Sequence, residues 1–205
     1  IIFAPYNADG VGVFDPTDNS FALVDISSTI STDWKFHGAA TASNGKIIFA
    51  PLNADGVGVF DPTDNSFALV DISSTISTYE KFQGAATASN GKIIFAPRNA
   101  DSVGVFDPTD SSFALVDISS TISTDSKFSG AATASNGKII FAPGNADGVG
   151  VFDPTDNSFA LVDISSTIST DDKFFGAATA SNGKMVFAPL NADGVGVFDP
   201  TDNSF

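Results

Sequence analysis

The sequence predicts an all-β fold, a β-propeller of four-stranded antiparallel blades, and three observations support this prediction. Laid on itself at an offset of 46 residues, the 205-residue chain is nearly unchanged, and a fixed period of that length indicates a repeat architecture. Full copies span 1–46, 47–92, 93–138 and 139–184, and a partial copy spans 185–205. Each copy holds four short runs of strand-forming residues separated by turn residues. The composition, with 20 Phe, 18 Gly, 10 Pro and no Cys, suits short strands and many turns, and it argues against helical bundles, collagen and disulfide scaffolds.

The first two strands of a blade can be followed in the unit 37–82. Residues 38–43 are small, and residues 46–50, Lys-Ile-Ile-Phe-Ala, are mostly β-branched or aromatic. Asn44-Gly45 stands between them and predicts a hairpin with a type I′ turn, in which both central residues take positive φ. We name these strands A and B. We place strand A next to the propeller axis, because only small side chains fit where blades converge.

The other two strands follow across polar turns. Residues 57–60 form strand C and residues 66–72 form strand D, and the segment 61–65, Asp-Pro-Thr-Asp-Asn, is typical of a turn. A Ser/Thr-rich connection, 73–81, leads to strand A of the next blade, and nothing in the unit has a sustained helical period. We expect phenylalanines to form the core between blades. In the first repeat these are Phe3, Phe14, Phe21 and Phe36, each with its repeat mates.

The repeat resembles known propeller blades. The stretch 42–49, Ala-Ser-Asn-Gly-Lys-Ile-Ile-Phe, followed by the stretch 57–62, Val-Gly-Val-Phe-Asp-Pro, is similar to NHL-type and gluconolactonase-type blades. In those blades a small inner strand, a glycine turn and a strand ending in Asp-Pro recur. The resemblance covers the whole chain and implies the propeller fold, and it implies no particular activity. The WD40 signature is absent, because the chain has no Gly-His pair and no Trp-Asp dipeptide.

The strand count leaves the closure of the ring open. Strands B and C occur five times and strands A and D four times, so the first blade (1–26) lacks strand A and the last blade (175–205) lacks strand D. We expect a single domain, 1–205, with five blades. The alternative is a four-bladed ring in which the last strand A completes the first blade and residues 185–205 are redundant. Unpaired strand edges invite pairing with another chain, so we also expect that a homo-oligomer could form through the terminal blades.

The charge of the chain argues against two classes of partner. A net charge of −15, without any cluster of basic residues, disfavours binding to nucleic acid or to an anionic membrane. No apolar run approaches the ~20 residues that a membrane-spanning helix requires. A protein without Cys is compatible with either redox environment, so the sequence leaves the compartment open.

Only 8 of the 46 repeat positions vary between copies. Five of them change little, at Ile1/Met185, Ile2/Val186, Gly10/Ser102, Asn19/Ser111 and Asp33/Tyr79. Three positions, which we call the variable columns, differ strongly. The first column holds Tyr6, Leu52, Arg98, Gly144 and Leu190. The second holds Trp34, Glu80, Ser126 and Asp172, and the third holds His37, Gln83, Ser129 and Phe175.

The variable columns predict a binding site on one face of the propeller. They lie in the B–C connection, in the D–A connection and at the start of strand A, and in an antiparallel blade these positions share one face. The A–B and C–D turns emerge on the other face. Variable loops on a rigid scaffold are the usual place for binding residues, and aromatic residues and Arg are common anchors. The predicted ligand-binding residues are Tyr6, Trp34, His37, Leu52, Glu80, Gln83, Arg98, Ser126, Ser129, Asp172, Phe175 and Leu190. Neutral drift at exposed positions after duplication is the alternative explanation.

Motifs for catalysis or metal binding are sparse. His37 is the only histidine, and the chain has no Cys and no Gly-x-Ser-x-Gly motif, so we predict no catalytic residue. The segments 7–10, Asn-Ala-Asp-Gly, and 15–18, Asp-Pro-Thr-Asp, supply oxygen atoms that could hold Ca²⁺. They lack the closing Glu of an EF-hand loop, and capping of turns explains both segments. We therefore predict no cofactor, with Ca²⁺ as the one alternative.

These observations predict a non-enzymatic, lectin-like recognition propeller. Its ligand would be a carbohydrate or a protein, bound through the face that carries the B–C and D–A loops. One alternative is a structural or engineered symmetric repeat protein that self-assembles through its incomplete terminal blades. A further alternative is a hydrolase or lyase with a site near the axis, around His37.

Overall fold

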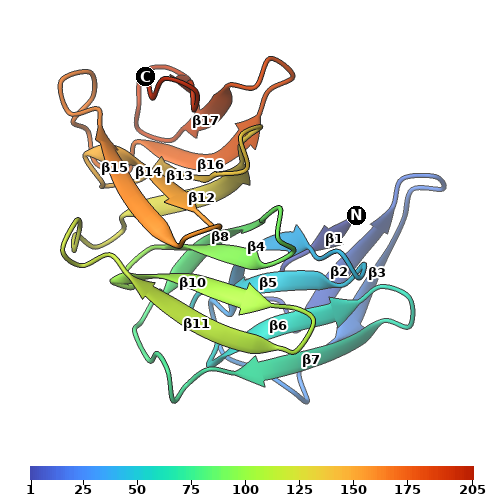
Figure 1. Ribbon diagram of the computed structural model, residues 1–205. Helices are drawn as coiled ribbons and strands as arrows, with labels where there is room; N and C mark the ends of the chain where they lie inside the picture. The colour runs from blue at the N-terminus through green and yellow to red at the C-terminus, as the bar shows by residue number, and fades with distance from the viewer.

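The computed structural model describes residues 1–205 and contains strands and no helix. The strands form five antiparallel sheets that follow one another along the chain, from the blue first sheet to the red last sheet in Figure 1. Within each sheet the strands pair in sequence order. The all-β fold and the five blades are therefore as predicted. No helix is present that could cross a membrane.

The first and last sheets have three strands, and the three central sheets have four. The first sheet consists of β1 (Ile2–Phe3), β2 (Gly10–Asp15) and β3 (Ser20–Asp25). The central sheets consist of β4 (Phe36–Thr41), β5 (Ile47–Pro51), β6 (Gly56–Asp61) and β7 (Ser66–Asp71); β8 (Phe82–Thr87), β9 (Ile93–Pro97), β10 (Ser102–Asp107) and β11 (Ser112–Asp117); and β12 (Phe128–Thr133), β13 (Ile139–Pro143), β14 (Gly148–Asp153) and β15 (Ser158–Asp163). The last sheet consists of β16 (Phe174–Thr179), β17 (Met185–Pro189) and β18 (Gly196–Phe198).

The hairpin between strands A and B forms, but its turn differs from the predicted type I′. Gly45 takes a positive φ of 84°, whereas Asn44 does not. The Gly45 N–H donates to the Ala42 carbonyl at 2.9 Å, and the Ala42 N–H donates to the Lys46 carbonyl at 2.8 Å. This is a three-residue loop that ends in one left-handed glycine. The predicted turn type is wrong because the Asn44 side chain accepts the Lys46 N–H at 3.1 Å, which caps the loop without a positive φ at Asn44.

The A–B and C–D turns connect neighbouring sheets. The Asn44 side chain donates to the Pro108 carbonyl at 3.3 Å, and this link joins the A–B turn of one sheet to the C–D turn of the next. The same link recurs from Asn90 to Pro154 and from Asn136 to Pro200. The A–B and C–D turns therefore share a face, as the sequence predicts.

The inner strands approach so closely that only glycine fits at their crossing point. A Cβ placed on Gly38 would lie 2.7 Å from the Gly84 Cα, and one on Gly84 would lie 2.7 Å from the Gly130 Cα. The Thr87 hydroxyl donates across this contact to the Thr41 carbonyl at 2.8 Å. The order predicted from small residues, with strand A innermost, is confirmed.

The core consists of four clusters, and each joins two successive sheets. In the first cluster Phe36, Phe49 and Phe60 of the second sheet pack on Val11 and Ile26 from the first repeat. Equivalent clusters join the second sheet to the third, the third to the fourth, and the fourth to the fifth. Each sheet thus presents a phenylalanine-rich face to the preceding sheet and an aliphatic face to the following one.

The two ends of the array leave apolar faces uncovered. Phe3 and Phe21 were expected in the core, but they are 51% and 59% exposed because no other sheet packs against their face of the first sheet. Val195 and Val197 are exposed on the last sheet. None of the four clusters joins the first sheet to the last, so the ring is not closed. The four-bladed alternative is wrong, because β16 pairs with β17 of its own sheet instead of completing the first blade.

Candidate functional site

A cavity of about 350 Å³ collects side chains from all five sheets. The B–C loops contribute the first variable column, the D–A connections contribute the second, and the inner strands contribute the third. The lining residues are Tyr6, Trp34, His37, Leu52, Glu80, Gln83, Arg98, Ser129, Asp172, Phe175 and Leu190. A neighbouring space of about 210 Å³, between the inner strands, shares His37, Ser129 and Phe175 with it. The cavity therefore lies over the point where the inner strands converge.

One wall of the cavity is a continuous aromatic cluster. The rings of Tyr6 and Trp34 are stacked, with centroids 5.9 Å apart and planes inclined by 22°. His37 stands edge-on to Tyr6 at 5.7 Å and edge-on to Phe175 at 5.3 Å. The contact between His37 and Phe175 links β4 to β16, the first and last of the inner strands. The cluster thus spans the open side of the array.

The other wall is polar and internally paired. The Arg98 Nε donates to a Glu80 carboxylate oxygen at 2.7 Å, and the Arg98 Nη1 donates to the Gln83 amide oxygen at 2.5 Å. Because the Arg98–Glu80 pair is largely shielded from water, we expect it to be stronger than a typical surface ion pair. Gln83 and Ser129 are buried, and Asp172 adds a further carboxylate. This wall offers fixed hydrogen-bond donors and acceptors.

The D–A connection places its variable residue by a repeated hydrogen bond. The Trp34 N–H donates to the Asn7 side-chain oxygen at 2.8 Å, and the Asn53 N–H donates to the Trp34 carbonyl at 3.0 Å. Glu80, Ser126 and Asp172 each donate to the corresponding Asn at 2.8 Å. All four residues have a left-handed backbone, with φ between 49° and 54°, which is uncommon for residues other than Gly. An invariant Asn therefore fixes the backbone while the side chain varies.

The surroundings of two cavity side chains, His37 and Tyr6, favour the neutral form of each. Burial, and then the positive charge of Arg98, lower the pKa of His37 below its ordinary value, so the imidazole is neutral at pH 7. Burial, and then the negative charge of Glu80, raise the pKa of Tyr6, so its hydroxyl keeps its proton. With Arg98 paired to Glu80, Asp172 is the one charged lining residue without an opposite charge paired to it.

The structure brings together every predicted site residue except Ser126. Ser126 has the same backbone geometry as Trp34, but it does not line the cavity. Sequence reasoning missed Tyr79, whose ring packs against Trp34 with centroids 6.2 Å apart. The signal was present, because Tyr79 replaces an Asp in the column beside Trp34.

Four lysines beneath the D–A connections were also missed. Lys35, Lys81, Lys127 and Lys173 are buried although each lies in a polar loop. The Lys35 ammonium donates to the Asn7 and Ala8 carbonyls at 3.3 and 3.2 Å, and the Lys127 ammonium lies 3.3 Å from Asp101. These lysines tie each connection to the preceding B–C loop. They are invariant among the repeats, so their role is to support the loops rather than to distinguish ligands.

The segments considered for Ca²⁺ have their oxygen atoms engaged in turns. The Asp15 carboxylate accepts the Thr17 N–H at 2.9 Å and the Thr17 hydroxyl at 2.7 Å, and Asp18 accepts the Ser20 N–H at 2.8 Å. In the other segment, the Asn7 side chain accepts the Trp34 N–H. The chain has no group of three His, Asp or Glu side chains arranged to hold a metal ion.

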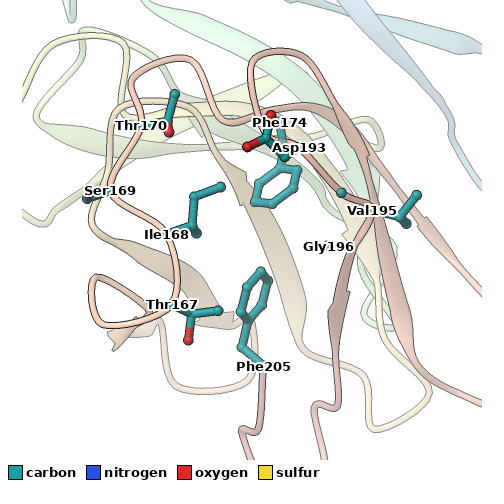
Figure 2. Close-up of a pocket in the computed structure, with 10 residues that line it drawn as sticks. Thr167, Ile168, Ser169, Thr170, Phe174, Asp193, Val195, Gly196 and Phe205 are labelled. Carbon is teal, nitrogen blue, oxygen red and sulfur yellow. The ribbon is translucent and has the colours of Figure 1, made fainter.

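A larger cavity, of about 420 Å³, lies away from the variable columns, at the last sheet. Figure 2 shows Phe174 and Phe205 in it, with Thr167 and Ile168 on one side and Val195 on the other. Most of its lining residues are invariant in the repeats, and the cavity occurs only where strand D is missing. This cavity therefore results from the absence of a fourth strand in the last sheet, and not from sequence differences between the repeats.

Comparisons with known proteins identify the fold. No protein-family model and no curated protein matches the sequence. A catalytically inactive histidine-to-alanine variant of virginiamycin B lyase from Staphylococcus aureus, solved with quinupristin, is similar with a TM-score of 0.77 and 13% identity over 97% of this chain and 62% of that one. A streptogramin B lyase gives a TM-score of 0.73 and 16% identity over 98% of this chain and 62% of that one. The chain is a β-propeller protein. The extracellular domain of a putative hybrid two-component system from B. thetaiotaomicron gives a TM-score of 0.71 and 17% identity over 98% of this chain and 27% of that one.

These similarities concern the fold of the propeller. The chain spans about three fifths of the length of the two lyases, and identities of 13–17% carry no residue roles across. The neighbours include a lyase family and an extracellular domain of a sensor system, so the same architecture serves different functions.

Proposed function

We propose that this propeller is a non-enzymatic binding module whose site is the cavity lined by the variable columns. One observation carries the proposal. The repeats are almost identical, yet the three positions at which they differ strongly supply all 11 residues that line one cavity. Drift would also have changed the many exposed Asp and Ser positions of the opposite face. A concentration of the strong differences on one concave surface is what selection for a ligand produces.

The chemistry of the cavity favours a carbohydrate. Tyr6 and Trp34 are stacked on each other and partly exposed, so they can present a platform for the apolar face of a sugar ring. Arg98 and Gln83 lie in a fixed hydrogen-bonded network that suits hydroxyl groups. The unpaired charge of Asp172 disfavours an anionic ligand. A protein side chain or loop is the alternative ligand, because aromatic residues and Arg are also common anchors of protein interfaces.

A glycan array, with a proteome array beside it, tests this assignment. We expect the wild-type chain to capture a restricted set of neutral glycans, and we expect Trp34→Ala, Tyr6→Ala and Arg98→Ala each to weaken capture at least tenfold. Lys46→Ala removes an exposed cation from the opposite face and serves as the matched control. Capture that survives all three substitutions would place the site elsewhere.

Assembly through the terminal blades is a second candidate, favoured by the uncovered ends. The first sheet exposes Phe3 and Phe21, which belong to the face that packs on a preceding sheet everywhere else. The last sheet exposes Val195 and Val197 of the complementary face. Phe21→Asp and Val197→Asp chains should each be monomeric and should form a 1:1 dimer when mixed, by light scattering. A wild-type mass of 21.0 kDa at all concentrations would exclude this candidate.

An enzymatic role around His37 is the remaining alternative. The resemblance of the repeat motif to NHL-type or gluconolactonase-type blades also remains a proposal. His37 is neutral and could accept a proton, but its ring contacts are Tyr6 and Phe175 instead of a carboxylate that would orient it. A lyase activity lost in His37→Ala, with ligand capture retained, would favour the enzyme over the binding module.

A further inference from the structure

Tyr79 is an exposed aromatic residue beside the cavity, and the packing of the blade does not require it. The other three repeats have Asp33, Asp125 and Asp171 at this position, so the fold accepts a short acidic side chain there. Tyr79 is 62% exposed and belongs to none of the four core clusters. Core packing therefore does not explain why one repeat has Tyr where the others have Asp.

Hydrogen bonds on both sides fix the backbone that carries the Tyr79 ring. The Asn99 side chain donates to the Tyr79 carbonyl at 3.3 Å, and the N–H of the following residue donates to the Asn53 side-chain oxygen at 2.8 Å. The Asn191 side chain donates to the Asp171 carbonyl in the same way, at 3.2 Å. The connection thus keeps its geometry whether Tyr or Asp stands at this position. A ring on a fixed support loses little backbone freedom when it binds a ligand.

Tyr79 extends the aromatic wall of the cavity onto the exposed surface. Its ring centroid lies 6.2 Å from that of Trp34, with the planes inclined by 42°, and the Trp34 centroid lies 5.9 Å from that of Tyr6. Tyr6 and Trp34 line the cavity and are 36% and 37% exposed, whereas the more exposed Tyr79 does not line it. The three rings therefore form a strip, the aromatic strip, that begins in the cavity and ends outside it.

The charges at the outer end of the aromatic strip favour a neutral ligand. Tyr79 stands where the other repeats have a carboxylate. The next residue in the chain, Glu80, has its carboxylate 2.7 Å from the Arg98 Nε, so its charge is compensated. A phenol ring offers an apolar face and a hydroxyl group. This combination suits a polyhydroxylated molecule with apolar faces better than an ion.

We propose that Tyr79 and Trp34 form an outer subsite, so that the ligand is a linear, neutral oligosaccharide that extends out of the cavity. This inference rests on the proposed function, because it assigns the length of the carbohydrate that the cavity binds. The outermost sugar unit packs its apolar face on the Tyr79 ring, and the inner units occupy the cavity. The spacings of 5.9 and 6.2 Å along the aromatic strip are similar to the spacing of successive units in a linear glycan. The inclination of the rings suits a chain whose successive units are rotated about its axis.

The test titrates wild-type and Tyr79→Asp chains with four linear series of one to four units: cello-, malto-, manno- and N-acetylchito-oligosaccharides. Calorimetry or competition measures each Kd. We expect at least one series to bind the wild-type chain with an affinity that rises with length. In Tyr79→Asp the affinity for the longest member should fall about tenfold, because one stacked unit is lost, and the affinity for the shortest member should stay the same.

Two results would overturn the outer subsite and leave the proposed function standing. One is a wild-type affinity that does not rise with length, and the other is an equal affinity of wild type and Tyr79→Asp for the longest member. A fall for short and long members alike would show that Tyr79 supports the cavity, and it would also overturn the subsite. Absence of binding by all four series would overturn the carbohydrate assignment and the subsite together.

The repeats supply matched controls for Tyr79→Asp. Because Asp is the residue of the other three repeats at this position, we expect the variant to fold with an unchanged urea midpoint. Tyr79→Phe keeps the ring and should keep the affinity for the longest member. Asp125→Ala changes the same position in the next repeat and should leave every affinity unchanged. Loss of long-chain affinity in Asp125→Ala as well would contradict a role specific to Tyr79.

Discussion

Trp34 combines a large side chain with a left-handed backbone, φ 54°, at the cavity that we propose as the binding site. A bulky residue in that region costs on the order of 1 kcal/mol or more. The hydrogen bond from its N–H to Asn7 holds it there and directs the indole toward Tyr6. The sequence indicated which columns vary, but not the positive φ, because Trp, Glu, Ser and Asp share no preference for it. Strain at a position of changing identity is consistent with a site kept for binding.

Replacing Trp34 should therefore separate stability from binding. We expect Trp34→Gly to be at least as stable as Trp34→Ala, by up to about 1 kcal/mol, because glycine takes a positive φ without strain. Both variants should lose the ligand equally. Urea unfolding measures the stability, and glycan capture measures the binding. A less stable Trp34→Gly would show that the backbone at this position is not strained.

His37 should give the cavity an acid-sensitive affinity. Its pKa lies below the ordinary value of 6.5, so the neutral ring persists through pH 7 and is lost only at lower pH. Protonation would add a second positive charge near Arg98 and would disturb the edge-on contacts with Tyr6 and Phe175. We expect the affinity to be constant from pH 8 to 7 and to fall below pH 6.5. His37→Gln should remove this dependence, and a fall that persists in it would implicate another group.

At the scale of the strand, the repeat made the architecture predictable. Alternating runs and turn residues located strands A to D, and the small residues of strand A placed it at the axis. The exact turn between A and B could not be predicted from Asn-Gly, because the Asn44 side chain offers the loop a second way to satisfy its N–H groups. The buried lysines were equally hidden, since the carbonyls around Lys35 come from the preceding B–C loop, which meets the D–A connection only in the folded chain.

The inner strands offer a matched pair of substitutions. Gly84→Ala places a Cβ 2.7 Å from the Gly130 backbone at a φ of 105°, so both a clash and strain oppose it. Gly176→Ala has a similar φ of 93° but nothing within 4 Å. We expect Gly84→Ala to lower the free energy of unfolding by about 3 kcal/mol or more, and Gly176→Ala to lower it by about 1–2 kcal/mol. Urea unfolding gives both values. Equal losses would mean that the inner strands do not approach as closely as described.

At the scale of the whole molecule, the repeat sequence did not determine whether the ring closes. Closure depends on the angle between adjacent sheets. The near-identical interfaces repeat this angle from sheet to sheet, but no motif within a single repeat reveals its value. The same limit applies to the site. The variable columns could be assigned to one face, but their meeting in one cavity depends on how the five sheets converge. Tyr79 was overlooked because one aromatic substitution in a loop resembles drift until its contact with Trp34 is known.

The aspartate turns should make the whole array sensitive to acid. Hydrogen bonds from the side chain and then the backbone of Thr17 hold the pKa of Asp15 below its ordinary value of 3.8, and Asp61, Asp107, Asp153 and Asp199 are held in the same way by their own Thr. The contribution of these hydrogen bonds to the free energy of unfolding is present above the unfolded-state pKa of the aspartates. It is lost as the pH falls through their lower folded-state pKa. We expect the urea midpoint to fall below about pH 4. Salt at 1 M, which screens the repulsion within a chain of charge −15, should leave this fall in place. A midpoint that rises through this range would contradict the prediction.

Trp34 allows a direct test of the proposal that the variable columns form one binding cavity, because it is the only tryptophan in the chain. The measurement is a fluorescence titration of the wild-type protein with the glycan that the array identifies, together with quenching by acrylamide. If the glycan occupies the cavity, we expect a saturable change in emission at the same Kd as capture, and protection of the indole from the quencher. Saturable capture with unchanged emission and unchanged quenching would contradict it.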